Sequence, residues 1–220
     1  AFMDLIHDAQ LWATKADVSM AAVLSPYDHI PAGPLTMRHL FTIYKYENQL
    51  FTLRMSGADI KQYLEYGFTN QFATMHTAND HLIRRGDDGK PVTPTFNYTS
   101  AAGIRYTVDI TKPAGERVEI LSMSDGSEFS LERDYRVAVN SYQASGGGNF
   151  VPVGLGWDAA TLKEHTIDTT PIDVRRYVAA YIAERDTITP HLRGDWQVIP
   201  TDLWQAGKDR EIANANRSFR

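Results

Sequence analysis

A run of short alternating segments between residues 96 and 141, with helical patterns before and after it, constrains the fold more than any other feature of this sequence. Every second residue from Ile104 to Ile110 is apolar, which is typical of a strand with one buried face. "RVEILSM" and "YRVAVNSY" predict two further strands, with a turn at Asp125-Gly126 between them. Consecutive strands between helices indicate an α+β fold, a single domain with a mixed β-sheet and flanking helices.

Helices are predicted on both sides of these strands. Residues 2–13 place their apolar side chains on one helical face, a capping box at Ser56 begins a second helix, and residues 172–185 form a third amphipathic pattern. "DVSMAAV", "FTLRMS" and "WQVIP" are further predicted strands. We expect one domain over residues 1–200. Residues 201–220 form a C-terminal tail, and the sequence is compatible with either a helical or a partly disordered tail.

Composition excludes several classes of function. A hydrophobic content of 43 % over 220 residues is typical of a globular chain with a hydrophobic core. The net charge of −5 argues against a protein that binds DNA or RNA duplexes. Without cysteine, the chain has no disulfide and no cysteine nucleophile, and no apolar run is long enough for a membrane span. The seven histidines lack the spacing of metal ligands, so neither a metal site nor a catalytic residue is predicted in this chain.

The segment "VNSYQASGGGNF", residues 139–150, is the one most typical of a binding site. It follows the end of a predicted strand, where ligands often lie. Glycine accepts backbone angles closed to other residues and lets another group approach the main chain closely. Phe150 could then present its ring to a planar ligand. In the alternative, the glycines form a tight turn and Phe150 is buried in the core; the sequence is compatible with both.

Several separated blocks of the chain together resemble one known family. The blocks are "DLIHDAQLWATKADVSM", "GPLTMRHLFTIYKYENQLFTLRMSGADIKQYLE", "AGIRYTVDITKPAGERVEILSMSDG" and "YRVAVNSYQASGGGNF". In this order they are similar to the C-terminal domain of the bacterial 5'-nucleotidase family, which includes UDP-sugar hydrolases and 2',3'-cyclic-nucleotide phosphodiesterases. The resemblance runs from about Phe2 to Pro200 and does not cover the tail.

The resemblance implies a parent protein with two domains. The N-terminal domain, expected upstream and absent from this chain, would hydrolyse a phosphate ester with two divalent metal ions, whereas this fragment alone would be inactive and hold no cofactor. The C-terminal domain would bind a nucleoside or nucleotide. The parent is expected to be periplasmic or extracellular, with a signal peptide upstream of this fragment. The alternative is a non-catalytic module that binds another ligand or a protein partner on the same scaffold.

The family holds the base between two aromatic rings, and the resemblance assigns these rings to Tyr46 and Phe150. Asn48, two residues after the first ring, is a candidate for the edge of the base or the ribose. The other substrate-binding residues that the resemblance implies belong to the glycine segment: Gly146, Gly147, Gly148 and Asn149.

The chain also departs from the family. Many members carry Asn-Gly-Gly-Gly-Ile-Arg after the first strand, but "MAAVLSPYDHIPAGP" contains no arginine, so that substrate contact is lost or replaced. The aspartate that often follows the second ring is shifted here to Asp158. Among the remaining aromatic residues, Tyr44 is expected to pack against the protein. Tyr142 is expected either in the core, which is favoured, or just behind the residues that contact the ligand. Arg105 is expected to face solvent.

Overall fold

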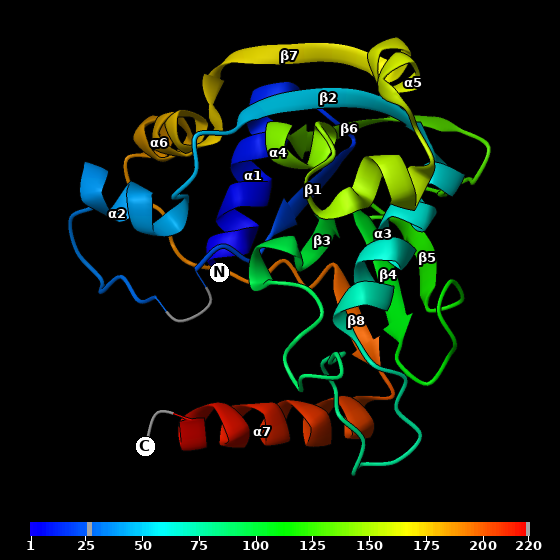
Figure 1. Ribbon diagram of the computed structural model, residues 1–220. Helices are drawn as coiled ribbons and strands as arrows, with labels where there is room; N and C mark the ends of the chain where they lie inside the picture. Colours follow the sequence, from blue (N-terminus) through cyan, green and yellow to red (C-terminus); the bar gives the residue numbers. More distant parts are fainter. Residues whose placement is uncertain (26–27, 219–220) are drawn as a thin grey trace.

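The computed structural model describes residues 1–25 and 28–218, and its strands form two mixed sheets (Figure 1). The five-stranded sheet has the order β3-β1-β6-β2-β7. In this sheet β1 and β6 run parallel, and the other neighbours run antiparallel. Its strands are β1 (Val18–Ala22), β2 (Gln49–Ser56), β3 (Thr99–Ala102), β6 (Asp134–Asn140) and β7 (Thr166–Asp173).

The second sheet has three strands in the order β5-β4-β8, with β4 antiparallel to β5 and parallel to β8. Its strands are β4 (Ile104–Asp109), β5 (Val118–Met123) and β8 (Trp196–Ile199). Gly103 alone separates β3 from β4 and has a φ of +97°, and a Cβ there would stand 2.1 Å from the carbonyl oxygen of Asp17. Only glycine fits such a position, and it lets the chain pass directly from one sheet into the other.

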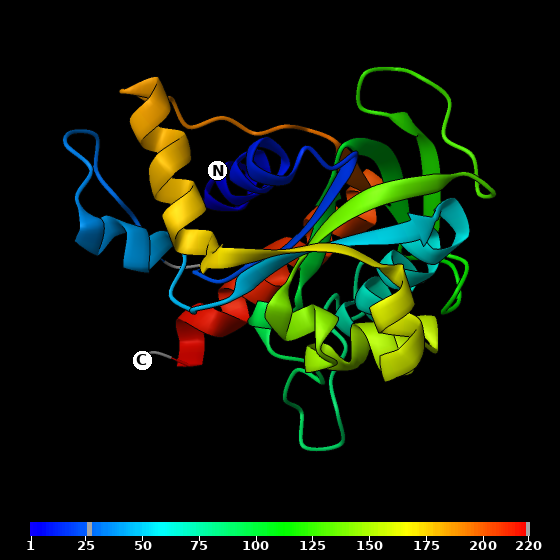
Figure 2. The ribbon, with the colours of Figure 1, turned by 90° about the horizontal axis from the view of Figure 1, so that it is seen from above.

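Two apolar clusters hold the sheets and helices together. Figure 2 shows α1 on one side of the five-stranded sheet and α3 on the other. The smaller cluster joins β1 and β2 to α1, α2 and α6, and the larger one joins the same strands to α3 and the three-stranded sheet. The helices are α1 (Phe2–Thr14), α2 (Met37–Ile43), α3 (Gly57–Gln71), α4 (Ser141–Ala144), α5 (Ala159–His165), α6 (Val174–Arg185) and α7 (Thr201–Ser218). Within the described residues, no helix is long and apolar enough to span a membrane.

The predicted capping box begins α3 as expected. The hydroxyl of Ser56 accepts a hydrogen bond of 3.1 Å from the backbone N–H of Asp59, and the Asp59 carboxylate accepts one of 2.9 Å from the backbone N–H of Ser56. Two of the backbone donors at the start of the helix are thereby satisfied. The helix then runs along the three-stranded sheet and carries Tyr63 and Phe68 into the larger cluster.

His7 connects α1 to the five-stranded sheet through buried polar contacts. Its Nδ1 lies 2.9 Å from the hydroxyl of Ser19 in β1, and its Nε2 lies 3.1 Å from the hydroxyl of Ser100 in β3. The Ser19 hydroxyl in turn donates to the side-chain oxygen of Gln10 at 2.7 Å. Burial lowers the pKa of His7 to about 4, so the imidazole is neutral at physiological pH.

The tail is helical through α7, which packs on the irregular segment of residues 73–92 (Figure 1). Trp204 meets Phe72 edge-on, with ring centroids 5.9 Å apart. The close fit at Gly207 leaves no room for a side chain, since a Cβ there would stand 2.8 Å from Cβ of Leu82. Glu211 forms an ion pair with Arg85.

The predicted class of the fold is confirmed, with one correction. Helices flank mixed sheets as expected, but the strands divide into two sheets rather than one. β7 is an edge strand that the sequence did not predict, because its residues "TIDTTPID" are mostly polar and half of them are exposed.

Candidate functional site

The loop between α2 and β2 carries Tyr46 and Asn48. Tyr44 anchors this loop, as expected for a packing residue, because its ring is buried and its hydroxyl accepts a hydrogen bond of 3.2 Å from Nδ2 of Asn48. Burial raises the pKa of Tyr44 to about 12, so the hydroxyl keeps its proton at neutral pH. Arg175 of α6 supports the loop, since its guanidinium donates to the Tyr44 carbonyl oxygen at 3.4 Å. Tyr46 stays at the surface, 37 % exposed.

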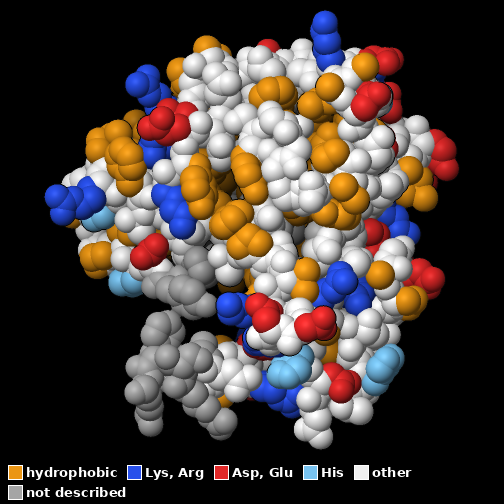
Figure 3. Space-filling model, in the orientation of Figure 1, with side chains coloured by type: hydrophobic (Ala, Val, Ile, Leu, Met, Phe, Trp, Pro, Cys, Tyr) orange, Lys and Arg blue, Asp and Glu red, His pale blue; other side chains and the backbone are white. Residues whose placement is uncertain are grey.

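Three aromatic residues from distant parts of the chain meet here and form what we call the aromatic cluster: Tyr46, Phe96 and Tyr142. Phe96 lies in the 3₁₀ turn η1 (Thr95–Asn97), and Tyr142 lies in α4. The Phe96 ring meets Tyr46 at 6.4 Å and 71°, and it meets Tyr142 at 6.2 Å and 77°. Apolar side chains gather over these elements in the middle of the face shown in Figure 3. Phe96 therefore stands edge-on between two exposed tyrosine rings.

Sequence reasoning missed part of this cluster. The expectation that Tyr142 lies in the core is wrong, because its side chain is 40 % exposed. The short helix α4 begins directly after β6, and its first turn leaves Tyr142 at the surface while the next residue, Gln143, is fully buried. The resemblance marked "FNYTSAAGIRY", which begins at Phe96, as a segment that borders the site in relatives, but it assigned no role to the Phe96 ring.

The glycine segment packs closely against two of the protein's own side chains. Gly146, with a φ of +100°, and Gly148, with a φ of +67°, adopt the left-handed backbone that favours glycine. A Cβ on Gly147 would stand 2.5 Å from ring atoms of Tyr142, and one on Gly148 would stand 2.8 Å from Oδ1 of Asn97. The bare backbone thus lies directly on the edge of the aromatic cluster.

Phe150 is part of the core, and the prediction that its ring stacks on a ligand is wrong. The π-helical segment η3 (Phe150–Leu155) turns the ring inward, where it is 2 % exposed. The ring stacks on Tyr63, with centroids 4.7 Å apart, and meets Tyr66 edge-on at 5.5 Å. Gly67 makes room for it, because a Cβ there would stand 3.0 Å from the Phe150 ring. Because it is buried and stacked on Tyr63, Phe150 does not form a slot with Tyr46.

Two buried carboxamides lie beside the glycine segment. Nε2 of Gln143 donates to the hydroxyl of Thr99 at 2.6 Å, whereas its Oε1 has no hydrogen-bond partner among the residues that the structure describes. Oδ1 of Asn97 also has none. By contrast, the side chain of Asn149 hydrogen-bonds to the phenol of Tyr66, whose pKa is raised mainly by burial. Buried polar atoms are normally paired, and these two acceptors are among six buried side-chain atoms without a partner in the described part of the chain.

The aromatic cluster and the residues around it are suited to binding a flat ligand. Nζ of Lys45 lies 5.4 Å from the centre of the Tyr46 ring and adds a positive charge beside the cluster. Exposed aromatic rings gain free energy by stacking on flat ligands. In the part of the chain that the structure describes, no group of three or more His, Asp or Glu side chains could hold a metal ion.

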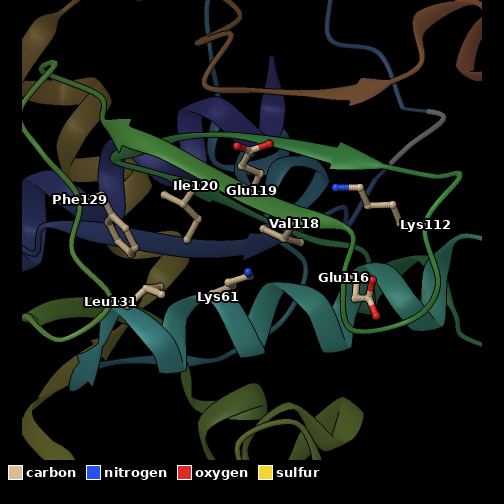
Figure 4. Close-up of a pocket in the computed structure, with 8 residues that line it drawn as sticks. All are labelled: Lys61, Lys112, Glu116, Val118, Glu119, Ile120, Phe129 and Leu131. Atoms are coloured by element: carbon tan, nitrogen blue, oxygen red, sulfur yellow. The ribbon is translucent and has the colours of Figure 1, made fainter.

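A separate groove of about 390 Å³ lies between α3 and the edge strand β5 (Figure 4). Its floor is apolar, and lysine and glutamate side chains line its rim. The edge of β5 is partly paired already, because the backbone N–H of Val118 donates to the carboxylate of Glu65 at 2.6 Å. We assign no function to this groove. Its lining residues are Lys61, Lys112, Glu116, Val118, Glu119, Ile120, Phe129 and Leu131.

Comparison with known proteins connects this fold to one family. The model of the 5'-nucleotidase C-terminal domain matches residues 1–153. The trifunctional nucleotide phosphoesterase protein YfkN of Bacillus subtilis (strain 168) is 26 % identical over 187 residues, which covers 79 % of this chain and 12 % of that protein. A 2',3'-cyclic-nucleotide 2'-phosphodiesterase/3'-nucleotidase of Yersinia enterocolitica is 26 % identical over 194 residues, which covers 80 % of this chain and 28 % of that protein.

Solved structures agree with this relationship at the level of the fold. A 5'-nucleotidase precursor of Thermus thermophilus has a TM-score of 0.65 at 24 % identity, covering 89 % of this chain and 34 % of that one. A Staphylococcus aureus protein crystallised with alpha-ketoglutarate has a TM-score of 0.73 at 23 % identity, covering 90 % of this chain and 36 % of that one. The chain spans only 12 % and 28 % of the two curated relatives named above. The match over residues 1–153, together with this fold, shows that the chain belongs to the 5'-nucleotidase C-terminal domain family.

Proposed function

We propose that this domain binds the base of a nucleoside or nucleotide at the aromatic cluster and serves as the substrate-binding part of a two-domain, metal-dependent phosphoesterase. The observation that carries the proposal is the pair of exposed tyrosine rings, Tyr46 and Tyr142, on either side of Phe96. Stacking of a base on an aromatic side chain is worth about 1–3 kcal/mol. Each of the two tyrosine rings offers one such contact.

Tyr142 takes the role that the resemblance gave to Phe150. The resemblance assigns the first ring of the family to Tyr46, and the exposure of its side chain supports that role. The second ring must also be accessible, and Tyr142 meets this condition. Asn48 remains a candidate for the edge of the base or the ribose: because its Nδ2 is held by the Tyr44 hydroxyl, its Oδ1 is the end left to face a ligand.

Hydrolysis is assigned to another part of the parent protein. In this proposal the metal-dependent step belongs to an N-terminal domain upstream. The described residues of this chain contain no group of three or more His, Asp or Glu side chains that could hold a metal ion. That domain would be the main protein partner of this one. The relatives named above are nucleotide phosphoesterases or phosphodiesterases, which supports a hydrolase as the parent. We further propose a periplasmic or extracellular location, which accords with the description of the Thermus thermophilus neighbour as a precursor.

Titration with adenosine tests this function. We expect millimolar adenosine to shift the NMR signals of Tyr46, Tyr142 and their neighbours, and we expect no release of phosphate from added nucleotide. Tyr46→Ala and Tyr142→Ala should each weaken binding by about 1–3 kcal/mol, since each removes one stacking ring.

The control is Tyr181→Ala, which removes a tyrosine of α6 that packs on Trp12 and Arg185, away from the cluster. It should leave the affinity for adenosine unchanged. A folded wild-type chain with no response to millimolar adenosine would refute the nucleoside site. That result would favour the alternative, a module that keeps the scaffold but binds another ligand or a protein.

A further inference from the structure

Asn97 presents a buried oxygen that no described residue of the protein uses as a hydrogen-bond acceptor. The residue follows Phe96 in η1 and is 9 % exposed, and its Oδ1 has no hydrogen-bond partner. A second carboxamide behaves in the same way nearby, since Oε1 of Gln143 is buried and unpaired while its Nε2 is held by Thr99. Both of these unsatisfied atoms are hydrogen-bond acceptors.

The glycine segment covers this oxygen. Gly148 lies so close that a Cβ would stand 2.8 Å from Oδ1 and 3.0 Å from Cγ of Asn97. Gly146 and Gly148 both have left-handed backbone angles, and neither has a side chain to hold the segment in place. A ligand at the aromatic cluster, whose central ring belongs to the neighbouring residue Phe96, reaches Oδ1 of Asn97 only if this segment moves aside, and the proposal below includes that movement.

We propose that Asn97 determines base specificity by accepting a hydrogen bond from the exocyclic amine of the bound base. The proposal rests on the nucleoside site proposed above. A base stacked on Tyr46 or Tyr142 beside Phe96 brings its edge, rather than its sugar, toward residue 97. The site then prefers bases with an amine, such as adenine, over bases with an oxo group in its place, such as hypoxanthine.

The preference follows from what each base offers to an acceptor. The amine of adenine donates a hydrogen bond to Oδ1, whereas the oxo group of hypoxanthine brings a second acceptor toward it. A site built around a hydrogen bond discriminates strongly against a ligand that lacks the partner, because the buried group is then left unpaired. Stacking itself is nearly the same for both bases, so it does not account for a difference between them.

The test compares the affinities of adenosine, inosine and purine riboside, which has neither an amine nor an oxo group, for the full chain. We expect adenosine to bind about tenfold more tightly than the other two, the effect of one good hydrogen bond. Asn97→Ala should bring the three affinities together, whereas Asn97→Asp, which retains an acceptor and cannot turn a donor toward the ligand, should keep the preference. Asn79→Ala, an exposed asparagine in a distant loop, is the matched control and should bind like the wild type.

The outcomes separate this inference from the proposed function. Equal affinities of the wild type for all three nucleosides would overturn the role of Asn97 and leave the nucleoside site standing. Absence of binding by any of them would overturn both. If Asn97→Ala does not fold, the wild-type ratio and Asn97→Asp decide, and loss of the preference in Asn97→Asp would also overturn the inference. NMR shifts of the glycine amides of residues 146–148 should accompany adenosine binding.

Discussion

Acidification should destabilise the domain through His7, whose ring nitrogens lie against the hydroxyls of Ser19 and Ser100. Burial lowers the pKa of this imidazole from 6.5 to about 4. The unfolded chain therefore binds the proton first as the pH falls. The contribution of the neutral His7 ring to the free energy of unfolding is complete above about pH 6.5. It is lost as the pH falls toward 4, and it changes no further below that.

The size of the effect follows from the two pKa values. Proton binding to the unfolded chain costs about 1.4 kcal/mol of stability at about pH 5.5 and about 3 kcal/mol at about pH 4. Urea unfolding of the wild type and of His7→Gln over this range measures it, because all other titrating groups are common to both proteins. The free energies of unfolding should converge as the pH falls, and curves that stay parallel would refute the burial of a neutral imidazole.

Three further substitutions test the supports of the site. Arg175→Ala should lower the free energy of unfolding by about 1–3 kcal/mol, because it removes a buried guanidinium that is hydrogen-bonded to the loop of Tyr46. The control, Arg176→Ala, removes an exposed neighbour and should change the free energy of unfolding by less than about 0.5 kcal/mol. Equal effects of the two substitutions in urea unfolding would argue against this support. Gly148→Ala should cost more than about 1 kcal/mol from its left-handed backbone alone, and an unchanged midpoint would show that the segment is not held as described. Phe150→Ala should cost about 3–5 kcal/mol as a core truncation, and a loss below about 1 kcal/mol would place the ring outside the core.

Elements with local patterns could be predicted from the sequence. The capping box of α3 needs only Ser56 and Asp59, and the alternation from Ile104 to Ile110 is enough to identify β4. The division into two sheets could not be predicted in the same way, because it depends on the approach of Gly103 to Asp17, which are remote in sequence.

The site was predictable only in part, because it too depends on contacts between residues that are remote in sequence. The resemblance identified the segment of Tyr46 and the glycines, and these do meet at one surface. Whether Phe150 faces out or in depends on Tyr63 and on the space left by Gly67, both far earlier in the chain. The sequence therefore allowed both orientations, and packing favours the buried one, which gains the hydrophobic free energy of a large ring.

The contact between α7 and the segment of residues 73–92 bears on where this domain ends. That segment has no helix or strand of its own, and the helix that covers it begins just beyond Pro200, where the family resemblance stops. A boundary drawn from relatives alone would discard Leu203 and Trp204 and leave the apolar surface beneath them open to water and to other chains. Anyone who trims the gene for expression or fusion should keep the coding region through α7, since the shorter product is the one at risk of aggregation.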